Sequence, residues 1–262
     1  MKGSRLTDQL KVARNLKLIL SYDGTDFSGW QVQPNAVTIQ GLLSSAIGRL
    51  TAENVLPQGS GRTDAGVHAL AQVATFSTNS PIPADNFVKA MNDILPSAIR
   101  VLEVAEMPAD FHARKSARAK TYRYRIYREP ICPPFLARYV WHFPYPLEEN
   151  AMTKAAGVVE GEHDFTSFAA VDPERGQENG EVSNLRTIFS SRCERQGGEL
   201  VYTVRGTGFL HHMVRNLVGT LILVGKGTLQ PSDVQHILEA RDRTAAGATA
   251  PARGLFLVNV EY

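Results

Sequence analysis

The sequence predicts an α+β fold of two halves, each an antiparallel sheet with helices on one face. Stretches with strand-like alternation and stretches with a helix-like apolar stripe occur twice along the 262 residues. The pattern restarts around 108–114, and the two series are similar in kind without repeating one sequence. This length is enough for two medium domains. We therefore expect a tail at 1–15, an N-terminal domain at 16–108 and a C-terminal domain at 109–262.

Alternating apolar residues open the predicted N-terminal domain. Three leucines lie on one side of a strand expected at 16–22, and Asp23-Gly24 follows as a turn signal. Thr38 is a suitable helix N-cap, because its hydroxyl accepts a bond from a free N–H of the first turn. The other elements expected here are the helix stripe Ile39, Leu42, Leu43, Ala46, Ile47 and Leu50, a strand at 71–78, a helix at 83–94 ended by Pro96, and a strand at 99–104.

The predicted C-terminal domain begins with a strand at 121–128, and a proline-rich connection follows it. Gly197-Gly198 separates two strand-like stretches, 185–195 and 199–206, and therefore predicts a hairpin. The remaining elements expected are helices at 148–159, 211–224 and 232–240, a closing strand at 255–262, and two exposed loops at 171–183 and 244–250.

Composition favours a soluble cytoplasmic protein. Hydrophobic residues make up 43% and charged residues 21%, which is ordinary for a globular chain. No apolar run reaches the roughly 18 residues that span a bilayer, and the longest, 217–224, predicts a buried helix. The first 15 residues have no apolar core and do not resemble a secretory signal. The two cysteines form no disulfide framework or metal knuckle, which fits a reducing compartment.

The charge distribution is more informative than the net charge of +2. Seven Lys or Arg residues and no acidic residue occur between Arg114 and Arg128. A solvated basic face and a phosphate-contacting face both account for this cluster.

A glycine-rich segment, Gly59–His68, is the first that suggests chemistry. Its three glycines indicate a tight turn that other groups approach closely. It is neither a phosphate-binding Walker loop nor a dinucleotide fingerprint, because it lacks both residue patterns. Either Asp64 merely caps backbone amides in the turn, or it is a catalytic carboxylate on a rigid mount beside Arg62.

The strand predicted within Lys120–Arg128 places aromatic residues on one face and arginines on the other. Tyr122, Tyr124 and Ile126 share a face by alternation. This pattern fits an aromatic core under a basic surface, and it also fits a platform for an unstacked base beside phosphate-binding arginines. Tyr122, nearest the strand start, is the better candidate for stacking on a base.

Arg215 lies inside an otherwise apolar predicted helix. Either its long side chain reaches solvent, or it is buried and pairs with a carboxylate, because a bare buried charge is costly. His211 and His212 are adjacent, so on a helix their side chains would diverge. They lack zinc-ligand spacing, and we expect no metal site.

Taken together, the segments resemble the tRNA pseudouridine synthase A family. The resemblance runs in order from about residue 16 to the C-terminus and departs at 173–181, which is longer and more polar than expected. The matching stretches are Tyr22–Gln31, Gly61–Ala69, Ala119–Tyr124, Gly161–Phe165, Arg186–Ile188, Phe209–Leu217 and Ala250–Leu257.

The resemblance implies an isomerase that converts uridine to pseudouridine at positions 38, 39 and 40 in the anticodon stem-loop of tRNA. It implies a homodimer without metal or organic cofactor, in which two related halves join their sheets around an active cleft. Asp64 matches the catalytic aspartate, acting as nucleophile or base, and Arg215 its ion-pair partner. Arg62 matches the arginine that helps the base leave its stack, Tyr122 the tyrosine that packs on the uracil, and Leu255 lies in the strand that lines the pocket.

Two other functions remain open at this point. An RNA-binding protein without catalysis would use the same strand and would not need Asp64. A hydrolytic glycosidase would ordinarily need a second carboxylate to activate water. Asp23 and Asp26 are available for that role, although turn formation explains them adequately.

Overall fold

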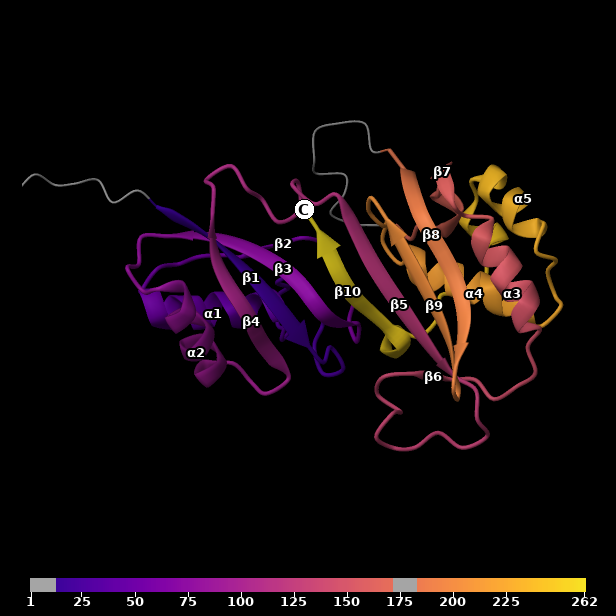
Figure 1. Ribbon diagram of the computed structural model, residues 1–262, viewed down its shortest axis with the longest axis horizontal. Coiled ribbons are helices and arrows are strands. Elements are labelled where there is room, and N and C mark those ends of the chain that lie inside the picture. The colour runs from indigo at the N-terminus through magenta and orange to yellow at the C-terminus, as the bar shows by residue number, and fades with distance from the viewer. Residues whose placement is uncertain (1–12, 172–182) are drawn as a thin grey trace, which may run out of the picture.

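The computed structural model describes residues 13–171 and 183–262. The polar segment 173–181 and most of the expected tail lie outside these residues. Within them, one extended sheet of ten strands runs through the molecule, with the α-helices gathered behind it in the view of Figure 1. The predicted fold class is confirmed.

The N-terminal part of the sheet holds four strands, β1 (Arg14–Tyr22), β2 (Gln58–Gly59), β3 (His68–Thr78) and β4 (Ile99–Met107), with helices α1 (Ile39–Thr51) and α2 (Ala84–Ile94). Thr38 caps α1 as predicted, since its hydroxyl oxygen accepts a bond from the amide of Gly41 at 3.3 Å. β1 lies between β3 and β4 and pairs antiparallel with both. This pairing continues beyond the apolar alternation, so the strands are longer than their sequence pattern predicted.

The C-terminal part holds six strands, β5 (Ala119–Tyr127), β6 (Trp141–His142), β7 (Gly161–Asp164), β8 (Leu185–Gln196), β9 (Glu199–Gly206) and β10 (Leu255–Glu261), with helices α3 (Glu149–Gly157), α4 (Met213–Gly225) and α5 (Asp233–Ala240). β8 and β9 form the predicted hairpin, and Gly197 adopts the left-handed φ of 58° in its turn. On β5 the expected alternation holds, because Tyr122, Tyr124 and Ile126 are buried. Short strands such as β6 were not predicted, since two residues show no periodicity.

The last strand of the chain joins the two parts of the sheet. The strand order is β4-β1-β3-β10-β5-β9-β8-β7, with β2 beside β3 and β6 beside β5. β10 pairs antiparallel with β5, where Leu255 lies opposite Tyr124. On its other side β10 pairs in parallel with β3 for a short stretch, where Phe256 lies opposite His68. Figure 1 shows β10 at the centre of the sheet, so residues far apart in the sequence meet there.

α4 is buried on nearly all sides, as the apolar stretch 217–224 predicted. It has 13 residues, and no helix in the described ranges is long and apolar enough to cross a membrane. The helix begins at Met213 rather than at 211, because His212 adopts a left-handed φ of 58°. The two histidines before α4 are therefore not helical.

The prediction of an exposed loop at 244–250 is only partly right, because Thr244, Ala245 and Ala248 are exposed whereas Gly247 and Ala250 are buried. The loop packs against α4, and the amide of Gly247 donates to the hydroxyl of Thr220 at 2.9 Å. Gly219 makes this approach possible, because a Cβ atom there would lie 1.7 Å from the carbonyl oxygen of Ala248. The run of small residues suggested a loop in solvent, whereas two glycines let the loop backbone lie on the helix.

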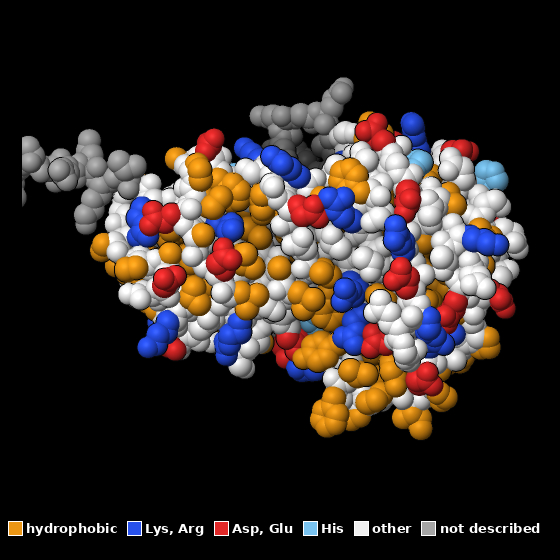
Figure 2. Space-filling model, in the orientation of Figure 1, with side chains coloured by type: hydrophobic (Ala, Val, Ile, Leu, Met, Phe, Trp, Pro, Cys, Tyr) orange, Lys and Arg blue, Asp and Glu red, His pale blue; other side chains and the backbone are white. Residues whose placement is uncertain are grey.

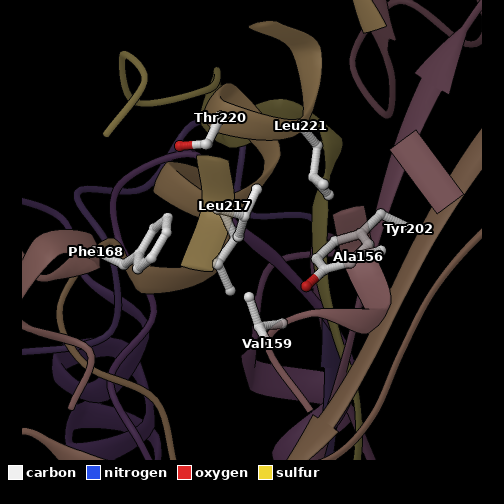
Figure 3. A pocket seen from close by; sticks show the side chains of 8 residues that line it. Ala156, Val159, Phe168, Tyr202, Leu217, Thr220 and Leu221 are labelled. Carbon is white, nitrogen blue, oxygen red and sulfur yellow. The ribbon is translucent and has the colours of Figure 1, made fainter. Parts of the chain in front are cut away.

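A small apolar cavity of about 10 Å³ lies in the core of the C-terminal part. Figure 3 shows Phe168 on one side of it, Tyr202 of β9 and Leu221 on the other, and Leu217 between them. This volume is at the lower limit for one water molecule, and apolar cavities of this kind stay dry. We therefore look for function elsewhere.

Candidate active site

Asp64 lies on a loop between β2 and β3 that neighbouring groups hold at several points. Gly59 contacts Trp30 so closely that a Cβ atom there would lie 2.6 Å from the indole ring. The amide of Trp30 donates to the carbonyl of Thr63 at 3.0 Å, and Gly66 adopts a left-handed φ of 77°. The tight, closely approached turn expected from the glycines is present. It fixes the backbone on which the carboxylate is mounted.

Arg215 reaches Asp64 from the first turn of α4. Its Nη1 atom lies 2.7 Å from Oδ2 of Asp64, and its Nε atom donates to the carbonyl of Ala250 at 2.7 Å. The two side chains retain only 15% and 19% of their exposure. The pairing expected from the sequence is therefore present, and it is a partly desolvated, charge-assisted contact in a defined orientation. Its catalytic use remains a hypothesis.

His211 and His212 converge on the same carboxylate, so the expectation that they diverge is wrong. Their ring centroids lie 4.0 Å apart. Nε2 of His211 lies 3.7 Å from Oδ1 of Asp64, and Nε2 of His212 lies 3.4 Å from Oδ2. The left-handed backbone of His212 breaks the helical spacing that the prediction assumed. Burial lowers the pKa of His212, although the charge of Asp64 opposes this shift.

This cluster also bears on the expected absence of a metal. One oxygen of Asp64 and one nitrogen of each histidine lie within 4.8 Å of one another, a spacing that metal ligands also show. The guanidinium of Arg215 already donates to Oδ2, and its positive charge opposes a cation at this place. We assign no metal site here, and the absence of a metal stays a prediction.

Tyr122, Leu255 and Arg62 surround Asp64. Tyr122 is buried on β5, its ring lies edge-on to Phe209 at 5.0 Å, and burial raises its pKa. Leu255 is buried at the start of β10. Arg62 is exposed, two residues before Asp64 on the same loop. The structure thus brings all five predicted site residues to one place.

That place is a cavity of about 760 Å³ to which both parts of the chain contribute. Four of the five predicted residues line it, together with Phe209, His211 and His212. The fifth, Arg215, contacts Asp64 from behind this lining. Its size is within the range of small-ligand pockets and is ample for one nucleotide. The cleft expected between the halves is therefore present as a space that residues far apart in the sequence enclose.

Basic residues continue the cavity wall beyond Tyr122. His112, Arg114, Lys115 and Lys120 line this part. The ammonium of Lys120 donates to the carbonyl of Ser60 at 2.5 Å, and burial lowers its pKa to about 8. One region of the basic cluster noted in the sequence thus lies in the cavity and is not simply a solvated face.

The comparison with known proteins agrees with this arrangement. Residues 18–114 and 155–262 match a family described as tRNA pseudouridine synthase. The chain belongs to this family. Asp64 lies in the first matched region and Arg215 in the second, and the structure brings them into direct contact.

Named relatives are similar over nearly the whole chain. A tRNA pseudouridine synthase A of Solibacter usitatus is 53% identical over 249 residues, which is 95% of this chain and 100% of that protein. Proteins of the same name from Moorella thermoacetica and Caldicellulosiruptor bescii are 46% and 45% identical, over 94% and 95% of this chain and 99% and 100% of their own lengths. The chain is therefore an isomerase of the pseudouridine synthase kind.

Proposed function

We propose that this protein isomerises uridine to pseudouridine at positions 38, 39 and 40 in the anticodon stem-loop of tRNA. The observation that carries the proposal is the 2.7 Å contact of Arg215 with Asp64, whose carboxylate lines a cavity wide enough for one nucleotide. A carboxylate held in this way has a fixed direction, and Arg215 bonds only its Oδ2 atom.

The reaction suits the residues that line the cavity. The bond between N1 and the ribose must break, and a bond from C5 to the same carbon must form. Nothing is oxidised, and no outside group is transferred. Asp64 acts either as nucleophile or as base on the ribose, and its position beside the cavity supports both routes.

The target base must leave its stack to reach Asp64, at a cost of a few kcal/mol. Arg62 is exposed on the catalytic loop and takes the place of the departing base in the stem-loop. Tyr122 packs on the extruded uracil, and Leu255 lines the pocket beside it. The contribution of these contacts offsets the unstacking cost.

We also propose that the protein acts as a homodimer in the cytoplasm. Exposed apolar side chains on the connection between β5 and α3 support an interface, since large apolar patches mark contact surfaces. Ile131 and Phe135 are 83% and 87% exposed, and Figure 2 shows hydrophobic side chains gathered on the lobe that this connection forms in Figure 1. A particle mass measured by light scattering, with Phe135→Asp as the comparison, tests the association.

The activity is tested by tritium release from a tRNA transcript labelled at uridine C5, since forming the new bond displaces that hydrogen. We expect release with the wild type and none with Asp64→Asn. Asp26→Asn is a matched control, because this carboxylate is exposed and pairs with Arg138 at 3.1 Å. Absence of release with intact tRNA binding would support an RNA-binding protein without catalysis. Release of free uracil by the wild type, and loss of that release in Asp26→Asn, would support a hydrolytic glycosidase.

A further inference from the structure

His211 presents a defined nitrogen to the reaction site. Its Nδ1 atom lies 3.0 Å from the carbonyl oxygen of Val171. A carbonyl oxygen only accepts, so Nδ1 carries a hydrogen. In the neutral ring Nε2 then bears the lone pair, and this atom lies 3.7 Å from Oδ1 of Asp64. The contact with Val171 thus selects the tautomer whose basic nitrogen is directed into the cavity.

This inference rests on the proposed function, because it concerns the proton that the isomerisation must remove from C5 of the uracil. Once C5 has joined the ribose carbon, C5 still holds its original hydrogen. That hydrogen leaves as a proton, its bonding electrons restore the C5–C6 double bond, and N1, released as an anion, takes up a proton. The sum is an isomerisation with no net proton change, but a base must stand next to C5 at this step.

Position limits which group serves as that base. Asp64 acts at the ribose, and C5 is bonded to the ribose carbon when its proton leaves. A base for C5 must therefore lie directly beside Asp64 and line the same cavity, as His211 does. We propose that Nε2 of His211 accepts the C5 proton.

Charge around the site supports the transfer. By either route Asp64 is again a free carboxylate once C5 has joined the ribose carbon, and it stabilises the new imidazolium beside it. Arg215 and His212 face the same carboxylate through its other oxygen, Oδ2, so Oδ1 remains for His211.

The other groups of the cavity are less suited to this role. Burial raises the pKa of Tyr122, which keeps its phenol neutral and makes it a weak base. Lys120 uses its ammonium to donate to the carbonyl of Ser60. His212 approaches the oxygen of Asp64 that already accepts from Arg215, and burial lowers its pKa below that of an ordinary imidazole.

The test compares turnover of tRNA carrying hydrogen or deuterium at uridine C5, under single-turnover conditions. General base catalysis contributes about 10²–10⁴-fold, so His211→Ala should lower the rate by at least about 10²-fold. Because loss of the C5 proton becomes limiting, the isotope effect should exceed that of the wild type. Added imidazole should restore part of the rate.

His212→Asn is the matched control, since asparagine tolerates the left-handed conformation at this position. It should slow the reaction through its contact with Asp64 while the isotope effect stays at the wild-type value. His211→Gln, which cannot take up a proton, repeats the test if His211→Ala does not fold, as judged by tRNA binding and thermal unfolding. If the His211 variant shows the wild-type isotope effect and imidazole restores no activity, His211 is not the base for C5. If the wild type itself does not release the C5 hydrogen, the proposed function is wrong instead.

Discussion

Substituting Asp64 and Arg215 singly and together should reveal a strong coupling between them in the free energy of unfolding. We choose Asp64→Asn and Arg215→Met, which keep much of the side-chain volume. Arg215→Met alone should cost about 3 kcal/mol or more, because it leaves a partly buried carboxylate without its partner. It also removes the bond from Nε to the carbonyl of Ala250. In the double variant the stranded charge is gone, so the total loss should be smaller than the sum.

The expected size of the coupling follows from the geometry. At the separation of 2.7 Å, the Coulomb energy is about 6 kcal/mol at an effective dielectric constant near 20 and about 1.5 kcal/mol in bulk water. The side chains are 15% and 19% exposed, so desolvation removes part of the larger value. Hydrogen bonds to charged groups contribute about 1.5–3 kcal/mol net. We therefore expect a coupling of about 2 kcal/mol.

Urea unfolding of the four proteins, followed by circular dichroism at one pH and one salt concentration, measures this coupling. The pair of Arg205 and Glu261 is a matched control, because its 2.6 Å contact is as short but its side chains are 38% and 36% exposed. Arg205→Met and Glu261→Gln should couple more weakly than Asp64 and Arg215, because solvent screens the exposed pair. Additivity within about 0.5 kcal/mol for Asp64 and Arg215 would refute the reasoning.

Three further perturbations test other parts of the site. Arg62→Ala should lower kcat/KM on a stem-loop with a paired target uridine. The loss should be smaller when that uridine is mismatched, since a mismatched base costs less to extrude. An equal loss of kcat/KM on both substrates would contradict the role assigned to Arg62. Because burial lowers the pKa of Lys120 to about 8, its ammonium is charged below that pH, and tRNA affinity should weaken about tenfold as pH rises through about 8. Lys120→Arg should abolish this pH dependence, and a Kd that rises equally with pH in both proteins would exclude Lys120 as its source. Gly219→Ala should destabilise the protein by about 3 kcal/mol in thermal or urea unfolding, because its Cβ would lie 1.7 Å from the carbonyl oxygen of Ala248; wild-type stability would show that the loop moves freely.

Local patterns predicted most of the elements and little of their order. Alternation on β5 and the cap at Thr38 are local properties, and both are where the sequence placed them. The position of β10 between β3 and β5 is set by pairing across more than 100 residues, and no window of sequence contains that information. The resemblance supplied it, because it implied that the sheets of the two halves join.

The site residues divide in a similar way. Asp64 and Arg215 were suspected for chemical reasons, as a carboxylate on a glycine-rich turn and a charge in an apolar helix, and the structure pairs them. The part played by His211 was not foreseen, because a regular helix was assumed through His212. A residue other than glycine rarely adopts the left-handed conformation, and the sequence His211-His212 gives no sign that His212 does so.

The orientation of Arg215 depends on contacts that begin far from the cavity. Gly219 lets the loop 244–250 lie against α4, and this loop ends at Ala250, whose carbonyl accepts from Nε of Arg215. The backbone is fixed here as well, since the amide of Ala250 donates to the carbonyl of Arg215 at 3.1 Å. With Nε held, the planar guanidinium can direct Nη1 only toward Asp64. The loop 244–250, which its composition suggested to be a solvent-exposed linker, therefore helps to orient Arg215 toward the carboxylate of Asp64. For this reason Gly219→Ala should lower kcat as well as stability.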